Sequence, residues 1–427
     1  MNPISIFDSM VEQTTFVFMH LANGPVPAGR LRMVTDGRNN YASFAYGNRY
    51  RQRLDAVSVD PESLPLDGPS GEILTDEGFD LFNGIRDAAP DGWGRYLMRK
   101  AADGRELSEF DYLVASGEHR VGALAFGATV ERPKPTVLGT AEVAHDRPVA
   151  LAALARAASD IATADTTDPA LRALLEAGSS LGGARPKAAV IENGVEWLAK
   201  FPAAQDSYDV PRAEHAAMSL ARACGLDVPD VDLRLVEGRA VYLIRRFDRD
   251  GARRVPFASA LTLLRAHEIA AGGYSYAEVA AQLRKHGSAP ARDLRELFRR
   301  MVFNVLVGNS DDHLRNHGML FDDKGWRLSP LYDVVPTPQL GTDRFLVLAL
   351  GSAGKRATLA NALSGHAAFG LEREEATRAI EEMRLRVASG WETSLKDSGL
   401  KDQDRVRIGR CFGASYDNDW AASLRTG

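Results

Sequence analysis

The strongest periodic pattern in the chain is an apolar stripe between residues 294 and 306. The stripe consists of Leu294, Leu297, Phe298, Met301, Val302, Val305 and Leu306. These positions recur at intervals of three and four, which places them on one face of an α-helix. Gly308 follows the last of them and is a typical residue at a helix end. We therefore predict a buried helix that ends at Gly308 and holds the residues after it in a fixed position.

The N-terminal part of the chain has the pattern of a β-rich domain. Its strand candidates are TFVFMHL, GRLRMV and YASFAYG, which are separated by turns rich in Gly, Pro and Asn. Residues 73–102 change to a helical pattern, in which Pro90 and Asp91 suit a helix start. The later run VGALAFGATV predicts a strand pair. We assign residues 1–146 to an N-terminal β-rich domain.

The rest of the chain changes from strands to helices. Residues 147–177 are Ala-rich with helical spacing, and residues 212–223 predict another helix. The strand candidates here are AAVI, EWLAKFP, VDLRLV and AVYLIRRF, with a turn expected at Glu192-Asn193-Gly194 after the first and a hairpin turn at Glu237-Gly238 after the third. We predict an α+β fold with two lobes, a β-rich small lobe at 147–248 and a helical large lobe at 249–427. Nucleotides commonly bind in the cleft of such a fold.

Composition and charge narrow the class of protein. The 427 residues, with 45% hydrophobic and 26% charged side chains, are typical of a globular protein. A net charge of −5 predicts no general affinity for nucleic acid. The two cysteines, Cys224 and Cys411, lie far apart, so neither a disulfide framework nor a thiolate zinc site is expected. Because no signal peptide or long apolar run is present, we expect a cytoplasmic protein with no membrane partner.

The candidate chemistry is concentrated in residues 309–333, NSDDHLRNHGMLFDDKGWRLSPLYD. Asp311 follows the predicted helix, Asn316 lies five residues later, and a predicted hairpin brings Asp333 back towards both. Metal-assisted phosphoryl transfer requires one group that orients a hydroxyl and further oxygen ligands for Mg²⁺. This pattern predicts a kinase in which Asp311 receives the proton of the attacking hydroxyl while Asn316 and Asp333 bind Mg²⁺.

A Gly-rich turn and a strand lysine could supply the phosphate site. Gly178, Gly182 and Gly183 allow close approach of the backbone to an anion, although a plain hairpin would have the same pattern. Lys200 lies on the strand that returns from the next turn, where it either meets phosphates or faces solvent. Glu214 either stabilises the helix dipole or pairs with Lys200.

A zinc hydrolase is a competing interpretation, because His313 and His317 are four residues apart. The corresponding HExxH motif requires Glu where Leu314 stands. In addition, Gly308 argues against a helix at this point. We therefore prefer the kinase interpretation.

The motifs together resemble the HipA family of bacterial Ser/Thr protein kinases, the toxins of HipBA-type toxin–antitoxin pairs. The matching strings are GRL, FAYG and LPL in the N-terminal domain, then SLGGARPK, WLAKFP, RRFDR, SDDHLRN and LSPLYDV, which extend over nearly the whole chain. The resemblance implies an ATP- and Mg²⁺-dependent protein Ser/Thr kinase with a bilobal kinase-like fold. It also implies that residues 1–146 form the family's N-terminal accessory domain.

The resemblance also implies a set of site residues, with Asp311 as the catalytic acid. The nucleotide-binding residues would be Gly182, Gly183, Ala184, Arg185, Pro186, Lys187, Lys200, Arg245, Arg246, Phe247, Asp248, His313, Asn316, Tyr332 and Asp333. The first six would form the phosphate loop and Lys200 would bind phosphate. The backbone at residues 245–247 would meet adenine, and Asp248 would lie close to the ribose.

The family inactivates itself by autophosphorylation at a position that corresponds to Ser180, although the adjacent Ser179 leaves the assignment open. A phosphate there adds about two negative charges, which would repel ATP phosphates and expel the loop. The chain departs from the family at Asp312, where glycine is commoner, and at Arg315, where lysine is common. Neither change removes an essential group.

The resemblance implies a protein substrate in translation, such as an aminoacyl-tRNA synthetase, and a small helix-turn-helix antitoxin of HipB type. DNA would be contacted only through that antitoxin. Two other functions stay open. The chain could be a corepressor that bridges the antitoxin on DNA without catalysis, or a kinase that phosphorylates a small molecule.

Overall fold

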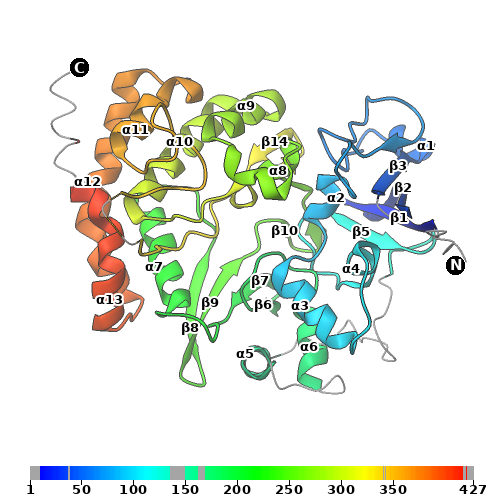
Figure 1. Cartoon of the computed structure of the whole chain (residues 1–427), viewed down its shortest axis with the longest axis horizontal. Helices are drawn as coiled ribbons and strands as arrows, with labels where there is room; N and C mark the ends of the chain where they lie inside the picture. The colour runs from blue at the N-terminus through cyan, green and yellow to red at the C-terminus, as the bar shows by residue number, and fades with distance from the viewer. Residues whose placement is uncertain are drawn as a thin grey trace, which may run out of the picture. The chain divides into compact units, whose positions relative to one another are not determined.

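The computed structural model describes residues 10–36, 39–134, 150–161, 169–339, 341, 343–416 and 420. The chain folds into two compact units, whose elements are labelled in Figure 1. Unit 1 comprises residues 1–147, 163–184 and 248–258, and unit 2 comprises residues 148–162, 185–247 and 259–427. The three-domain division predicted from the sequence stays a prediction.

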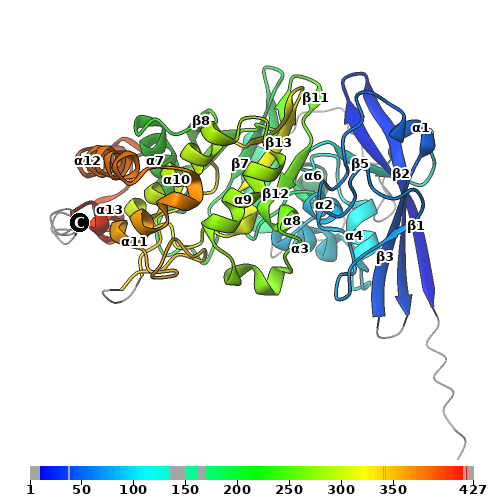
Figure 2. The ribbon, with the colours of Figure 1, turned by 90° about the horizontal axis from the view of Figure 1, so that it is seen from above.

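Unit 1 contains a five-stranded antiparallel sheet, as its strand pattern predicts. The strands follow the order β4 (Ile73–Leu74), β3 (Asn39–Tyr46), β2 (Gly24–Asp36), β1 (Val11–Leu21) and β5 (Leu124–Gly127). Figure 2 shows β1, β2 and β3 as long neighbouring strands. The strand pair predicted for VGALAFGATV is wrong, because only β5 forms there and pairs with β1. The chain then turns back, and the Lys134 amide donates to the Phe126 carbonyl at 3.1 Å.

The helices of unit 1 are α1 (Asn48–Arg51), α2 (Asn83–Asp87), α3 (Gly92–Ala101), α4 (Glu109–Ala115) and α6 (Pro169–Gly178). The predicted start at Asp91 is confirmed, since its carboxylate accepts from the Gly92 amide at 2.7 Å and caps α3. The helical prediction for residues 73–82 is wrong. Leu81 and Phe82 are buried without helical structure. Tertiary burial thus overrides the local pattern.

The small lobe of unit 2 is a four-stranded antiparallel sheet with helices packed on it. The strand order is β6 (Lys187–Glu192), β7 (Val195–Lys200), β9 (Arg239–Arg245) and β8 (Val231–Val236), and the helices are α5 (Leu151–Asp160) and α7 (Val210–Ala223). Asn193-Gly194 and Glu237-Gly238 make the two predicted hairpin turns, and all four residues have positive φ. Asp209 caps α7 through the Arg212 amide at 3.2 Å, so the helix begins two residues before the predicted start.

The large lobe is mainly helical and is organised around the helix that the apolar stripe predicts. Three short strands come before this lobe in the chain. They are the hairpin of unit 1 formed by β10 (Arg249–Asp250) and β11 (Arg253–Arg254), and β12 (Phe257–Ser259), within which the chain passes from unit 1 to unit 2. Its elements are α8 (Ala260–Leu263), α9 (Tyr276–His286), α10 (Pro290–Val307), β13 (Gly318–Asp322), β14 (Gly325–Leu328), α11 (Leu359–Ser364), α12 (Arg373–Asp397) and α13 (Asp402–Gly409). Short 3-10 helices occur at Glu268–Gly273, Leu314–Asn316, His366–Phe369 and Arg410–Tyr416.

Helix α10 is the core of this lobe. All seven stripe residues are buried, and the helix packs against α9, α11 and α12. The two-lobed α+β plan is therefore present in unit 2. In the part of the chain that the structure describes, no helix combines the length and apolar character needed to cross a membrane.

The end of α10 depends on a glycine for two separate reasons, which one pair of variants can separate. Gly308 has φ +66°, and a Cβ there would lie 3.0 Å from both the Cβ and the carbonyl oxygen of Cys411. Gly370 has nearly the same φ, +69°, but open space around it. We expect Gly370→Ala to lower the free energy of unfolding by about 1 kcal/mol, the cost of the left-handed conformation. Gly308→Ala adds a clash and should cost about 2–3 kcal/mol.

Urea denaturation of the two variants and the native protein measures this difference. Equal decreases in the free energy of unfolding of the two variants would show that Cys411 shifts to accommodate the new Cβ without loss of stability.

Candidate active site

A loop at the end of α10, residues 309–317, carries the predicted catalytic acid. Asn309 fixes its start, because its backbone amide donates to the Asn304 carbonyl at 3.0 Å and its side chain to the Asn304 side chain at 3.1 Å. Asp311 is exposed. Asn316 is buried and its Nδ2 donates to the Asp311 carbonyl oxygen at 3.0 Å. The loop thus presents the Asp311 carboxylate to solvent from a fixed backbone.

Asp312, the next residue, is buried and anchors the loop to the helices beneath it. The Tyr276 hydroxyl, at the start of α9, donates to its carboxylate. His317 Nε2 lies 3.1 Å from the same carboxylate. Asn304 Nδ2 in turn donates to the Tyr276 hydroxyl at 3.0 Å. Sequence reasoning missed this network, since no local signal links Asp312 to a tyrosine 36 residues earlier.

The two histidines of the loop do not have the arrangement that the zinc interpretation requires. Leu314–Asn316 forms a single 3-10 turn, so His313 and His317 are not one turn apart on an α-helix. His317 is buried against Asp312, whereas His313 is half-buried. These positions disfavour a shared metal ion.

The hairpin after the loop returns the chain as predicted. Strands β13 and β14 pair antiparallel, and after β14 the Val335 amide donates to the Asn309 side chain of the loop at 3.4 Å. The Tyr332 hydroxyl donates to the Arg315 carbonyl oxygen at 2.6 Å, and its ring centroid lies 5.2 Å from that of Phe247. Asp333 follows with φ +60°, a left-handed conformation that is uncommon outside glycine and costs energy.

Lys200, at the end of β7, lies between two carboxylates. Its Nζ is 2.6 Å from Glu214 Oε1, on α7, and 2.6 Å from Asp333 Oδ1. Lys200 and Glu214 are almost fully buried, while the side chain of Asp333 is 42% exposed. Lys187 faces Lys200 across the β6–β7 ladder. Of the two alternatives for Glu214, pairing with Lys200 is therefore the observed one.

The charges of this cluster shift the pKa values of its members. Partial desolvation opposes the ionisation of Asp333, but the Lys200 and Lys187 ammonium groups outweigh it and hold the pKa of Asp333 well below its usual range. Burial also opposes the charge on Lys200, yet Asp333 and Glu214 raise its pKa. Burial raises the pKa of Glu214, and Lys200 counters this only in part. The cluster therefore retains a protonated Lys200 and an ionised Asp333 at neutral pH.

The donor atoms on the loop and after the hairpin fit a magnesium ion. Mg²⁺ prefers hard oxygen ligands, often one or two carboxylates together with substrate phosphates and water. Asp333 provides an ionised carboxylate. The Nδ2 of Asn316 is used by the Asp311 carbonyl, which leaves the carboxamide oxygen as its ligand atom. This pair of residues could hold Mg²⁺ when a nucleotide supplies further oxygens.

The remaining predicted residues lie in both units. In unit 2, Arg185 forms an ion pair with Asp206 at 2.7 Å, and Arg246 forms one with Glu196 at 3.0 Å. The exposed Arg245 is 3.4 Å from Asp230. The Pro186 carbonyl accepts from the Phe201 amide, which continues the β6–β7 ladder.

Unit 1 contains Gly182, Gly183, Ala184 and Asp248. Gly183 has φ +87°, and its carbonyl accepts from the Trp93 amide at 2.9 Å. The buried Asp248 carboxylate accepts from the Gly122 amide at 2.7 Å and pairs with Arg249 at 2.8 Å. The nucleotide contacts of these residues stay a prediction.

Two serines precede the glycines, and the structure distinguishes them. The Ser179 hydroxyl oxygen accepts from the Gly117 amide at 2.9 Å. The Ser180 hydroxyl is buried with no hydrogen-bond partner among the described residues. A buried hydroxyl without a partner is costly, so moving Ser180 into solvent would break no hydrogen bond of its hydroxyl, whereas moving Ser179 would break the bond to Gly117.

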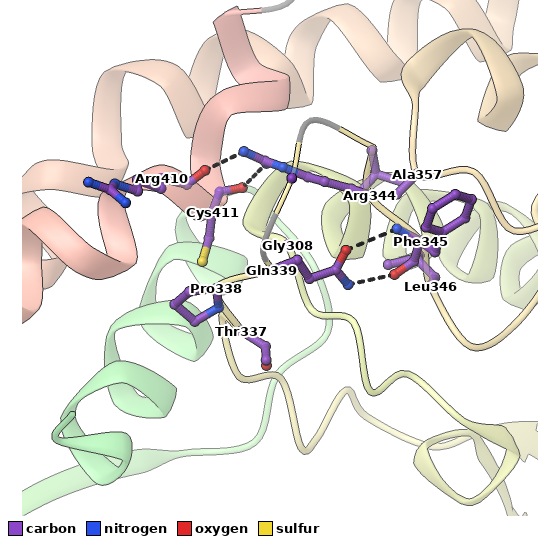
Figure 3. Close-up of a pocket in the computed structure, with 12 residues that line it drawn as sticks. Gly308, Thr337, Pro338, Gln339, Arg344, Phe345, Leu346, Ala357, Arg410 and Cys411 are labelled. Atoms are coloured by element: carbon purple, nitrogen blue, oxygen red, sulfur yellow. Dashed lines mark hydrogen bonds between the residues drawn. The ribbon is translucent and has the colours of Figure 1, made fainter. Parts of the chain in front are cut away.

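A cavity of about 320 Å³ lies at the C-terminal end of α10 and is separate from these residues. Figure 3 shows Arg344 reaching the carbonyl oxygens of Arg410 and Cys411, and Gln339 bonded twice to the Phe345 backbone, at 2.8 and 3.1 Å. Arg344 and Gln339 are thus both hydrogen-bonded to other residues of the cavity wall. None of the predicted site residues lines it.

Comparisons with known proteins agree with the motifs. Residues 179–391 match the HipA-like C-terminal domain family. The chain is 31% identical over 215 residues to "Putative kinase Y4mE" of Sinorhizobium fredii, covering 48% of this chain and 43% of that protein. It is 30% identical over 223 residues to "Putative kinase Y4dM" of the same organism, covering 48% and 53%. The chain thus spans about half the length of the curated relatives it matches.

A solved structure extends the similarity to most of the chain. It is described as the Shewanella oneidensis MR-1 toxin–antitoxin system HipA, HipB and its operator DNA complex. The matched chain has 17% identity and a TM-score of 0.67, covering 93% of this chain and 95% of that one. At this identity the similarity concerns the fold, and it confirms the predicted bilobal kinase-like α+β fold.

The lowered pKa of Asp333 predicts a pH-dependent contribution to stability. A carboxylate whose pKa is lower in the folded state stabilises the fold above its unfolded pKa of about 3.9 and loses this effect as pH falls. Asp333→Asn removes the charge and keeps a residue that tolerates positive φ. We expect the native protein to exceed the variant in melting temperature at pH 7, and the difference to shrink from about pH 5 downward.

Thermal unfolding between pH 7 and pH 3 measures this difference, with Asp323→Asn in the β13–β14 turn as the control for loss of an exposed carboxylate. A difference that is constant over this range would show that the Lys200 contact does not stabilise the fold.

Proposed function

Because this chain belongs to the HipA family, we propose that it is an ATP- and Mg²⁺-dependent protein Ser/Thr kinase of the HipA toxin type. The observation that carries the proposal is the ion cluster at Lys200, with Asp333 and Glu214 each 2.6 Å away. A lysine held by an acid on the neighbouring helix, next to a second acid that can bind metal, is the recurring arrangement of protein kinases. The exposed Asp311 lies on the loop that the Asp333 segment packs against.

In the proposed reaction, Asp311 orients a serine or threonine hydroxyl of the substrate protein and accepts its proton. The hydroxyl oxygen then forms a bond to the γ-phosphorus of ATP, and the bond between that phosphorus and the β–γ bridging oxygen breaks to release ADP. The product is a phosphoprotein. Asp311 suits this role because its carboxylate is exposed while its backbone is fixed by Asn316 and by the buried Asp312.

The same proposal assigns the nucleotide. Lys200 and Lys187 would meet its phosphates together with the glycine loop at residues 182–186, and the backbone at 245–247 would meet adenine. Asp248 would lie near the ribose, and His313 and Tyr332 would line the site. Asn316 and Asp333 would hold Mg²⁺, which when bound neutralises charge on the transferred phosphoryl group.

We propose that the substrate is a protein of translation, such as an aminoacyl-tRNA synthetase, and that the kinase acts in the cytoplasm. Its proposed partner is a small helix-turn-helix antitoxin of HipB type, through which alone it would contact DNA. The net charge of −5 supports indirect contact, since it gives no general field that attracts phosphates.

A corepressor role is the second candidate. The solved structure with a similar fold is described as a complex of HipA, HipB and operator DNA, which favours a comparable assembly here. Such a role needs binding of the antitoxin and does not need Asp311. It can also coexist with kinase activity.

The role of Asp311 predicts a specific loss of activity. Asp311→Asn keeps the size of the side chain and removes the proton acceptor, so phosphate transfer should fall by about 100-fold or more. The measurement is incorporation of label from γ-labelled ATP into lysate proteins, with circular dichroism as the check on folding. Asp323→Asn changes an exposed acid of the β13–β14 turn and is the matched control. Full activity of Asp311→Asn would contradict the assignment.

Self-inactivation predicts a phosphate on Ser180. After incubation with Mg²⁺ and ATP, mass spectrometry of the peptide that contains residues 178–187 should find one phosphate. Ser180→Ala should abolish it, whereas Ser179→Ala should retain it. An active enzyme with an unmodified peptide would exclude this regulation, and loss of the signal only in Ser179→Ala would reassign it.

A further inference from the structure

Ile269 is the most exposed large apolar side chain among the described residues of unit 2, with 92% of its surface accessible. Full burial of an isoleucine is worth about 1.5–3 kcal/mol, which this residue forgoes in the free protein. Single exposed apolar residues are common on protein surfaces and need no explanation by themselves. The position of Ile269, described next, is what distinguishes it.

Ile269 lies in the 3-10 helix Glu268–Gly273, within a segment at residues 265–275 that we call the Ile269 turn. This turn is fixed to the rest of the large lobe at both ends. At its start, the Ala266 amide donates to the Leu261 carbonyl at 3.0 Å. At its end, the Ala349 amide donates to the Tyr274 carbonyl at 3.0 Å, and the chain enters α9 at Tyr276. The His267 side chain accepts from the Ile269 amide at 3.3 Å and orders the turn from within. Ile269 is therefore presented on an anchored turn.

Two contacts place this turn beside the catalytic loop. Glu268, the neighbour of Ile269, forms an ion pair with Arg315 of the 309–317 loop. Tyr276, which follows the turn, bonds to the buried Asp312 of the same loop. An exposed ion pair adds little stability, so the turn is held by its backbone bonds and by Tyr276, and the ion pair shows that the neighbour of Ile269 lies next to Arg315. The pairing also neutralises Glu268 and Arg315, so the surface next to Ile269 has no unbalanced charge from them.

We propose that this turn is a docking site for the substrate polypeptide, and that Ile269 contacts a large apolar side chain close to the phosphorylated Ser or Thr. The proposal rests on the proposed kinase function. A polypeptide that offers its hydroxyl to Asp311 must pass over the 309–317 loop, and the turn borders that loop at Arg315. Arg315 is only four residues from Asp311, and part of that interval is a compact 3-10 turn.

These short spacings limit where the apolar residue of the substrate can lie. An extended chain covers roughly 3.3–3.6 Å per residue. About five residues of an extended substrate would therefore reach from Asp311, across the loop and the Arg315–Glu268 ion pair, to Ile269. The expected substrate segment is extended, with Ile, Leu, Val, Met or Phe at one fixed position within about five residues of the acceptor. Burying Ile269 against such a side chain recovers part of the free energy that its exposure forgoes.

The test uses the full-length protein and a library of peptides made by digesting a dephosphorylated bacterial proteome. The library is incubated with Mg²⁺ and ATP, and phosphorylated sites are identified by mass spectrometry. The native enzyme should select an apolar residue at one position near the acceptor. For the best peptide, Ile269→Asp should lower kcat/KM at least 10-fold through a higher peptide KM, while kcat and the KM for ATP stay nearly unchanged.

Leu235→Asp is the matched control, because Leu235 is a similar aliphatic residue, 66% exposed, on β8 of the small lobe. It should leave peptide kinetics and selection unchanged.

A native enzyme that phosphorylates peptides without apolar selection, or an Ile269→Asp variant with native peptide kinetics, would overturn the docking site and leave the kinase function in place. An altered oligomeric state with unchanged kinetics would likewise reject it. A native enzyme that transfers no phosphate to any peptide or protein would instead refute the kinase function, and the docking site with it.

Discussion

The burial of one ammonium group constrains the whole candidate site. Taking a lysine out of water costs several kcal/mol unless opposite charges meet it with good geometry. Lys200 meets this condition only because α7 delivers Glu214 from one side and the chain after β14 delivers Asp333 from the other. The Lys200–Glu214 pair lies within the small lobe, and the Lys200–Asp333 pair links the small lobe to the large lobe of unit 2. Removing both carboxylates would leave an uncompensated buried charge.

The adjacent acids of the 309–317 loop divide two tasks that one residue could not perform together. Asp312 is buried and bonded to Tyr276 and His317, so its carboxylate is committed to structure. The Asp311 carbonyl oxygen accepts from the His313 amide and from Asn316 Nδ2, both at 3.0 Å, while the residue itself is exposed. A rigid backbone beneath an exposed functional group is what preorganisation requires. The buried carboxylate of Asp312 thus anchors the loop that carries Asp311.

The sequence predicted those features that depend on nearby residues. The stripe of α10, its end at Gly308, the cap at Asp91 and the Asn193-Gly194 turn are all local signals, and the structure has each of them. The predictions for residues 73–82 and for a second strand after β5 failed because tertiary packing decided those segments. The partners within the site, Tyr276 with Asp312 and Lys200 with Asp333, are 36 and 133 residues apart in the chain. The predicted hairpin brought Asp333 back towards the loop and so indicated part of the Lys200–Asp333 contact, whereas no sequence pattern indicated the Tyr276–Asp312 contact.

The left-handed backbone of Asp333 has a consequence for how this family can diverge. Side chains longer or more branched than Asp, Asn or Gly are disfavoured at φ +60°, whatever their charge. A change to Glu would preserve the carboxylate and still be penalised by the backbone. Lineages that lose the need for this carboxylate are therefore expected to drift to Asn or Gly. The residue type at this one position would then record whether selection for the acid has been relaxed in a given relative.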